Sequence, residues 1–154
     1  LLFKDELSPS LKWMDYDPDP EKMLREHDAA LIIGDPALGF KKKDTTIYDL
    51  SEEWFRRTGK TFVHAVIAVR EKINIGQAQK QFIQKAKIEG CRRIKEVVRA
   101  YKGLSEVDVN ILEDYLEKKI IYNLDEAAID GLIHFSNLCY KHGVISKKIS
   151  IQFL

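Results

Sequence analysis

The sequence predicts an α/β fold with a helical C-terminal cover. Two apolar runs, residues 29–33 and 61–69, are rich in β-branched residues and lack polar alternation, which is typical of strands buried on both faces of a parallel sheet. A helical segment lies between them, and the chain beyond residue 73 has mainly helical periodicity. The expected order is therefore strand, helix, strand, helix, strand and then three helices.

The first elements are marked by proline and acidic residues. Residues 11–16 alternate in polarity and predict a half-buried strand, which Pro18 ends. Asp19 can cap a short helix that has Pro20 at its first position and closes near residues 27–28. The buried strand 29–33 follows, and Gly34-Asp35-Pro36 forms a turn at its carboxyl end.

The middle of the chain repeats this arrangement. Asp49, with Glu52 three residues later, predicts the start of a helix over about 50–58, and Gly59 provides a left-handed stop. The second buried strand, 61–69, comes next. These signals place a helix between two core strands.

Three helical segments complete the chain. Apolar residues recur every three or four positions over 74–102, which predicts one long helix or two joined near Gly90. Ser105 with Asp108 predicts the start of a helix that ends near 119, and Asn123 with Glu126 predicts a last helix that ends at Gly143.

Composition limits the classes of function. The chain has 154 residues, 45% hydrophobic and 32% charged, with a net charge of +1, so disorder and a nucleic-acid partner are poorly supported. Cys91 and Cys139 lie far apart with no metal-ligand spacing, which fits a reducing compartment. No apolar run reaches the roughly 20 residues of a membrane span, and no secretion signal opens the chain, so we expect a cytoplasmic protein without a membrane partner.

Asp35 is the strongest candidate for chemistry. It follows a predicted buried strand, and ligands in open α/β sheets bind at the carboxyl ends of strands. Gly34 would allow a ligand close to the backbone, and the amides of Ala37 and Leu38 could bind a carboxylate if a helical turn begins there. The alternative is that Asp35-Pro36 is ordinary turn chemistry.

His64 is the second candidate. It lies in a strand predicted to be buried, where a titratable ring is unexpected unless it is hydrogen-bonded or faces a cavity. A hydrogen-bonded core histidine is the competing interpretation. The aromatic residues Trp54, Phe55, Phe62 and Phe82 are spaced for packing and are expected in the core.

Several strings of the sequence resemble one enzyme family. DAALIIGDPAL at 28–38, YDLSEEW at 48–54, and FVHAVIAVR at 62–70 closely resemble the menaquinone-biosynthesis MqnA/MqnD family. The resemblance continues through GLIHF at 131–135 to the helix end at His142-Gly143, so it covers nearly the whole chain. Where the dihydroxynaphthoate-forming branch has a catalytic histidine, this chain has Gly34, which favours the branch that dehydrates chorismate.

The resemblance implies a fold and a domain organisation. Members of the family have two α/β lobes around a cleft, a type II periplasmic-binding-protein-like arrangement in a cytoplasmic protein. Residues 1–47 are then expected to belong to the second lobe and residues 48–154 to the C-terminal part of the first lobe. Because the Tyr-Leu-Asn strand that normally opens the first lobe is not found, the chain resembles only the C-terminal part of the family, with a partial fold.

The resemblance also implies a reaction. The expected activity is that of a carbon–oxygen lyase, a hydro-lyase that converts chorismate to 3-[(1-carboxyvinyl)oxy]benzoate on the futalosine route, with no cofactor and no metal. Asp35 is the expected catalytic residue, and the expected substrate-binding residues are Gly34, Asp35, Pro36, Ala37 and His64. The isolated chain is expected to be inactive, and the family implies a monomer or a homodimer.

Two departures and two alternatives accompany this assignment. Thr61 replaces the usual proline, and His64 replaces the usual aromatic residue, so details of the cleft are expected to differ. One alternative is a non-catalytic module of solute-binding-protein-like fold that binds a small carboxylate. The other is the sister dihydroxynaphthoate synthase, which the missing histidine disfavours.

Overall fold

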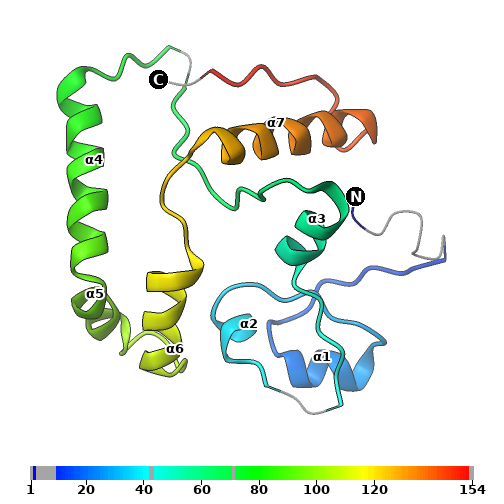
Figure 1. The fold of residues 1–154 in the computed structure, drawn as a ribbon. Helices are drawn as coiled ribbons and strands as arrows, with labels where there is room; N and C mark the ends of the chain where they lie inside the picture. The colour runs from blue at the N-terminus through cyan, green and yellow to red at the C-terminus, as the bar shows by residue number, and fades with distance from the viewer. Residues whose placement is uncertain (1, 3–9, 42–43, 71, 153–154) are drawn as a thin grey trace. The chain divides into compact units, whose positions relative to one another are not determined.

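A computed structural model of the chain describes residues 2, 10–41, 44–70 and 72–152. Figure 1 shows helices joined by extended segments. The helices within the described ranges are α1 (Pro20–Glu26), α2 (Asp35–Gly39), α3 (Leu50–Thr58), α4 (Gln77–Arg92), α5 (Ile94–Tyr101), α6 (Val109–Asp114), the π-helix η1 (Tyr115–Lys119) and α7 (Glu126–Lys141). The chain forms two compact units.

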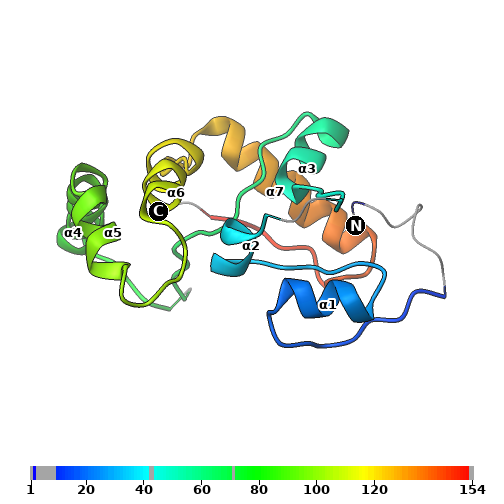
Figure 2. The same ribbon diagram turned by 90° about the horizontal axis from the view of Figure 1, so that it is seen from below.

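Unit 1 comprises residues 1–12, 45–69 and 123–154, and α3 and α7 are its helices. The two helices lie side by side in both views (Figure 1 and Figure 2). Trp54 of α3 is only 1% exposed and forms the centre of the unit's core. Its ring contacts Phe62 and Phe135 edge-on, at centroid distances of 5.8 and 5.6 Å. Aromatic pairs in this geometry add stabilisation beyond the apolar area that they bury.

The backbone of α7 approaches the extended segment after α3 very closely. Gly131 is buried, and a Cβ atom built on it would lie 1.9 Å from the carbonyl oxygen of Thr61. An ion pair between Lys60 and Asp130 lies beside this contact. Glycine is therefore required at 131 by close packing against backbone, since any side chain would displace the segment.

Unit 2 comprises residues 13–44 and 70–122 and contains α1, α2, α4, α5, α6 and η1. The ribbon changes direction between α4 and α5 at Arg93 (Figure 1 and Figure 2). Val98 of α5 is 1% exposed and Leu112 of α6 is 5% exposed, and these two helices contact each other. The hydrogen bond from Ile120 N–H to the Tyr115 carbonyl closes the π-helical turn.

The helices predicted from local signals are confirmed, with small shifts. Asp19 caps α1, Asp49 caps α3, and Gly59 ends α3 with φ 65°. Of the alternatives for 74–102, two helices are correct, with the break three residues beyond Gly90. The cap of α6 is Asp108 and that of α7 is Asp125, because their side chains accept from Asn110 N–H and Ala128 N–H.

The burial expected for the two apolar runs is not found. No β-strand is formed by the described residues, and both runs are extended chain. Ile33 is 80% exposed and Ile67 is 73% exposed. A central strand needs neighbouring strands to satisfy its backbone and helices to cover its faces, and no described segment pairs with either run.

Two of the aromatic residues expected in the core are also exposed. Phe55 is 61% exposed and Phe82 is 73% exposed, whereas Trp54 and Phe62 pack as expected. Phe82 and Ile83 of α4 line a shallow apolar surface together with Ile75, which precedes that helix. The helical spacing predicts the apolar face of α4 correctly, but spacing alone does not show which element, if any, packs on this face.

Candidate functional site

The candidate turn at Gly34–Ala37 forms the start of α2 in unit 2. Gly34 is its N-cap residue and has φ 71° and ψ −152°, a conformation that only glycine adopts without strain. A Cβ atom added there would meet nothing within 4 Å, so the requirement for glycine comes from the backbone and not from crowding. Pro36 lies in the first turn, where its missing N–H costs no hydrogen bond.

The proposed anion-binding amides are occupied. A helical turn does begin at Asp35, as the sequence interpretation required. However, the N–H groups of Ala37 and Leu38 both donate to the Gly34 carbonyl, at 3.0 and 3.1 Å. These bonds close the first turn of a short helix, so the prediction that the two amides bind a carboxylate is wrong.

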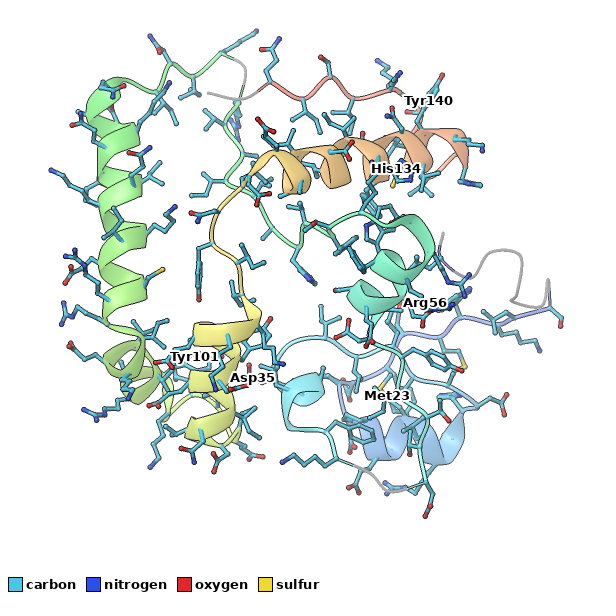
Figure 3. All side chains as sticks on the ribbon, in the orientation of Figure 1. Met23, Asp35, Arg56, Tyr101, His134 and Tyr140 are labelled. Atoms are coloured by element: carbon cyan, nitrogen blue, oxygen red, sulfur yellow. The ribbon has the colours of Figure 1, made fainter. Side chains whose placement is uncertain are left out.

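Asp35 forms a contact that the sequence did not indicate. The hydroxyl of Tyr101, the last residue of α5, donates to Asp35 Oδ2 at 3.3 Å (Figure 3). The charge of Asp35 and this hydrogen bond, with some desolvation, raise the pKa of the Tyr101 phenol. The phenol is therefore held in its protonated, donating form beside a carboxylate that is partly shielded from solvent.

Tyr101 lies within the periodic stripe of apolar residues that predicts helix over 74–102. Nothing local separates it from other aromatic residues on that stripe, because its partner lies 66 positions away. Its place at the end of a helix was the only available signal, since a phenol there can present a polar tip beyond its apolar body. The structure adds it to Gly34, Asp35, Pro36 and Ala37 as a candidate site residue.

His64 belongs to unit 1 and is exposed, so the expected buried environment is wrong. A hydrogen bond of 3.0 Å links its Nε2 to Ser51 Oγ in the first turn of α3. Its ring also meets Phe62 edge-on, with centroids 5.1 Å apart. The extended chain carries the side chain to the surface, where the ring has an ordinary polar partner.

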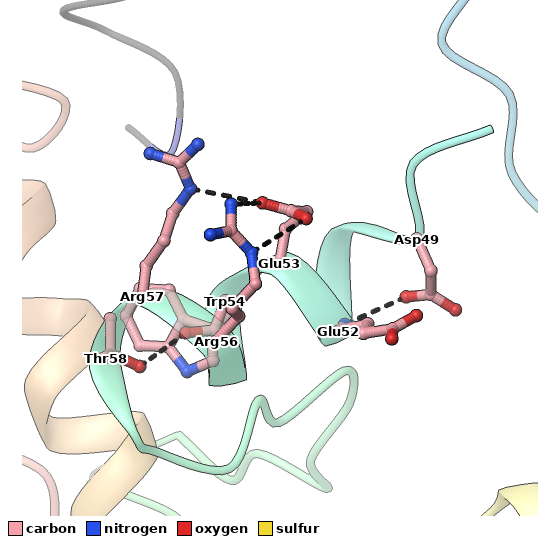
Figure 4. A network of polar contacts seen from close by, with 7 residues as sticks. All are labelled: Asp49, Glu52, Glu53, Trp54, Arg56, Arg57 and Thr58. Carbon is pink, nitrogen blue, oxygen red and sulfur yellow. Dashed lines mark hydrogen bonds and ion pairs between the residues drawn. The ribbon is translucent and has the colours of Figure 1, made fainter. Parts of the chain in front are cut away.

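The turn that holds Ser51 is itself fixed by charge. Asp49 accepts from the Ser51 and Glu52 amides at 2.8 and 3.2 Å. Further along α3, Arg56 donates two hydrogen bonds to Glu53, of 2.6 and 3.2 Å, and Arg57 adds a third (Figure 4). Arg56, and then Arg57, hold the pKa of Glu53 below its usual range against an opposing effect of desolvation. This network orders α3 and brings no group to a reaction centre.

Two other kinds of site are absent from the described ranges. No group of three or more His, Cys, Asp or Glu side chains there could hold a metal ion. None of the helices in the same ranges has the length and apolar character needed to cross a membrane. The chemistry available at α2 is therefore a carboxylate, a phenol hydroxyl and a permissive backbone at Gly34.

Comparison with known proteins gives two matches and one absence. A family model described as menaquinone biosynthesis matches residues 1–141. A chorismate dehydratase from Thermus thermophilus is 30% identical over 132 residues, which cover 75% of this chain and 48% of that enzyme. The chain thus spans about half the length of this curated relative. No solved structure matches.

Proposed function

The chain belongs to the menaquinone-biosynthesis family, and on this premise we propose that it forms part of a chorismate dehydratase. The proposed reaction converts chorismate to 3-[(1-carboxyvinyl)oxy]benzoate by removing one ring proton and the ring hydroxyl as water. The similarity to the Thermus chorismate dehydratase is the observation that carries this proposal. We extend the proposal to a two-lobed α/β fold divided near residue 47, located in the cytoplasm.

Asp35 is the residue that we assign to the substrate. Chorismate bears two carboxylates, which a side-chain carboxylate repels, so Asp35 fits the ring hydroxyl or a water molecule better than either acid group. Tyr101 restricts the Asp35 side chain through its hydroxyl, which limits the orientations that the carboxylate samples. Gly34, Pro36 and Ala37 belong to the cap and first turn of α2 next to Asp35, and we assign them to the surface that contacts the substrate.

The aromatic product makes the reaction favourable, so the task of the site is orientation. The ring proton and the hydroxyl must be held in a geometry that allows both to leave, and groups fixed before the reaction serve this purpose. Asp35 is fixed at the first position of α2 and by the contact with α5. His64 remains a proposed substrate contact, and its hydrogen bond to Ser51 would orient it.

A spectroscopic assay distinguishes this proposal from simple binding. Chorismate is incubated with the chain joined to the part of the Thermus relative that lies outside the match, and its absorbance and the benzoate product are followed. Dehydratase activity predicts loss of chorismate with an equal yield of product. Binding of chorismate without product would support the alternative of a carboxylate-binding module, and for the isolated chain we expect no turnover.

The second enzymatic candidate is the sister dihydroxynaphthoate synthase. Gly34 disfavours it, because the histidine expected at this position in that branch is replaced by a residue with no side chain. Formation of dihydroxynaphthoate from that enzyme's own cyclic precursor, supplied in a parallel assay in which chorismate is not consumed, would favour that assignment.

A further inference from the structure

The proposed dehydration needs a proton donor that the Asp35 carboxylate cannot supply. A ring hydroxyl expelled without a proton leaves as hydroxide, which is a strong base and a poor leaving group. A positioned acid that protonates such an oxygen typically raises the rate by about 100- to 10,000-fold. An ionised carboxylate only accepts hydrogen bonds, so Asp35 can hold the hydroxyl but cannot protonate it. The proton has to come from a neighbouring group.

Tyr101 is the neighbour of Asp35 that carries a proton. Its hydroxyl donates to Asp35 Oδ2 at 3.3 Å and so joins the end of α5 to the start of α2 within unit 2 (Figure 3). Tyr101 is 41% exposed and Asp35 is half-buried, so both side chains can be reached from solvent. A molecule that contacts the carboxylate can therefore also contact the phenol.

The hydrogen bond between the two side chains is long and therefore easily exchanged. Bonds between a hydroxyl and an oxygen are usually about 2.5–3.0 Å, so a contact of 3.3 Å is weak. A substrate hydroxyl that donates to the same carboxylate would place its oxygen beside the phenol. The phenol hydrogen can then rotate about its carbon–oxygen bond, away from Asp35 and toward the substrate oxygen.

We propose that Tyr101 is the general acid that protonates the departing ring hydroxyl, while Asp35 is the acceptor that holds this hydroxyl. The role rests on the proposed function, because it needs chorismate in contact with Asp35. The ring carbon–hydrogen bond breaks and its electron pair enters the aromatic ring, and the carbon–oxygen bond breaks as the oxygen takes the phenol proton and leaves as water. The ring proton passes to solvent, and the phenolate takes a proton from solvent, which restores Tyr101.

Tyr101→Phe in the joined protein removes this proton and keeps the aromatic ring. We expect kcat for chorismate to fall by about 100-fold, with KM changed by less than about threefold, because the lost interaction forms only in the transition state. Tyr140→Phe is the matched control. Tyr140 is an exposed tyrosine of α7 in unit 1, and this variant should keep the kcat of the parent.

A fluorinated tyrosine at position 101 distinguishes an acid from a residue that only positions Asp35. The phenol of 2,3,5-trifluorotyrosine has nearly the shape of tyrosine but loses its proton near neutral pH. Its kcat should be close to that of the parent in mildly acidic buffer and should fall as the pH rises through neutrality. The parent should keep its kcat over this range, because the charge of Asp35 holds the pKa of Tyr101 above the ordinary phenol value of about 10.

The outcomes separate this role from the proposed function. An unchanged kcat in Tyr101→Phe, or a fluorotyrosine profile that follows that of the parent, would overturn the role of Tyr101 in a protein that still forms the benzoate product. Absence of product from the folded parent would overturn the proposed function, and this step with it. If far-UV circular dichroism shows that Tyr101→Phe does not fold, the fluorotyrosine protein, which keeps the hydroxyl, decides alone.

Discussion

Replacing Gly131 with alanine should destabilise the protein, although alanine is the better helix former. A Cβ at this position would lie 1.9 Å from the Thr61 carbonyl oxygen, whereas carbon–oxygen contacts are ordinarily no closer than about 3.3 Å. The segment that carries Thr61 must therefore move by roughly 1.4 Å, by the difference between these distances. The obstructing atom is backbone and cannot rotate away, so we expect an overpacking cost of about 1–3 kcal/mol.

Gly90→Ala is the matched control for this prediction. Gly90 is also a helical glycine, in α4, but a Cβ there would meet nothing within 4 Å. Alanine should therefore stabilise the protein by about 0.5–1 kcal/mol through its helix propensity. Subtracting the two changes in the free energy of unfolding removes the propensity effect and leaves the packing cost at Gly131.

Urea unfolding followed by far-UV circular dichroism measures both variants. Gly131→Ala should lower the midpoint and Gly90→Ala should raise it, with an unchanged dependence on urea. Equal stabilisation by both substitutions would show that α7 does not lie against the backbone of Thr61, and would refute this packing of unit 1.

Three further predictions concern α3 and the candidate site. Asp49→Ala removes the cap of α3 and should cost about 1 kcal/mol in urea unfolding; an unchanged midpoint would contradict the capping role. Glu53→Gln should destabilise the protein at neutral pH, because the arginine partners lower the pKa of Glu53 in the folded state. The contribution of ionised Glu53 to the free energy of unfolding is present above the pKa of the unfolded state. It is lost as the pH falls through the pKa of the folded state. A loss that persisted unchanged in acid would contradict this sign. Asp35→Asn should move the Tyr101 phenol titration, read by ultraviolet absorbance, to lower pH, since the neighbouring charge raises the pKa of this phenol. Tyr101→Phe identifies which part of the signal belongs to Tyr101, and an unchanged titration in Asp35→Asn would contradict the contact.

The helices were predictable because their signals are local. Asp19 and Asp49 lie directly before the amides that they cap, and Gly59 and Gly143 adopt the positive φ that ends a helix. Shifts of the predicted caps, such as from Asn123 to Asp125, arose where several polar residues compete for the same amides.

The strands could not be settled in the same way. A run such as 29–33 favours a strand through its side chains, but a strand exists only when another backbone pairs with it. Ile33 remains exposed because no described segment pairs with or covers this run. The two-lobed fold therefore stays a proposal.

The candidate site was predictable only in its local part. The turn at Gly34 and Asp35 was recognised from the order of residue types, and the positive φ of Gly34 agrees with it. The contact between Asp35 and Tyr101 depends on how α2 and α5 pack, which no local pattern encodes. Leu38 is the fourth residue of α2, and its amide bonds to the carbonyl of the cap residue as in any α-helix, while the Ala37 amide joins it through an i→i−3 bond.

The turnover of chorismate by the joined protein, with and without the Asp35 carboxylate, tests the central claim most directly. Asp15→Asn is the control, because Asp15 is an exposed aspartate of the same unit. We predict formation of 3-[(1-carboxyvinyl)oxy]benzoate by the parent and the control, and a rate at least about tenfold lower for Asp35→Asn, a loss of about 1.4 kcal/mol in transition-state stabilisation. Absence of the product from the folded parent, or an unchanged rate for Asp35→Asn, would contradict the assignment.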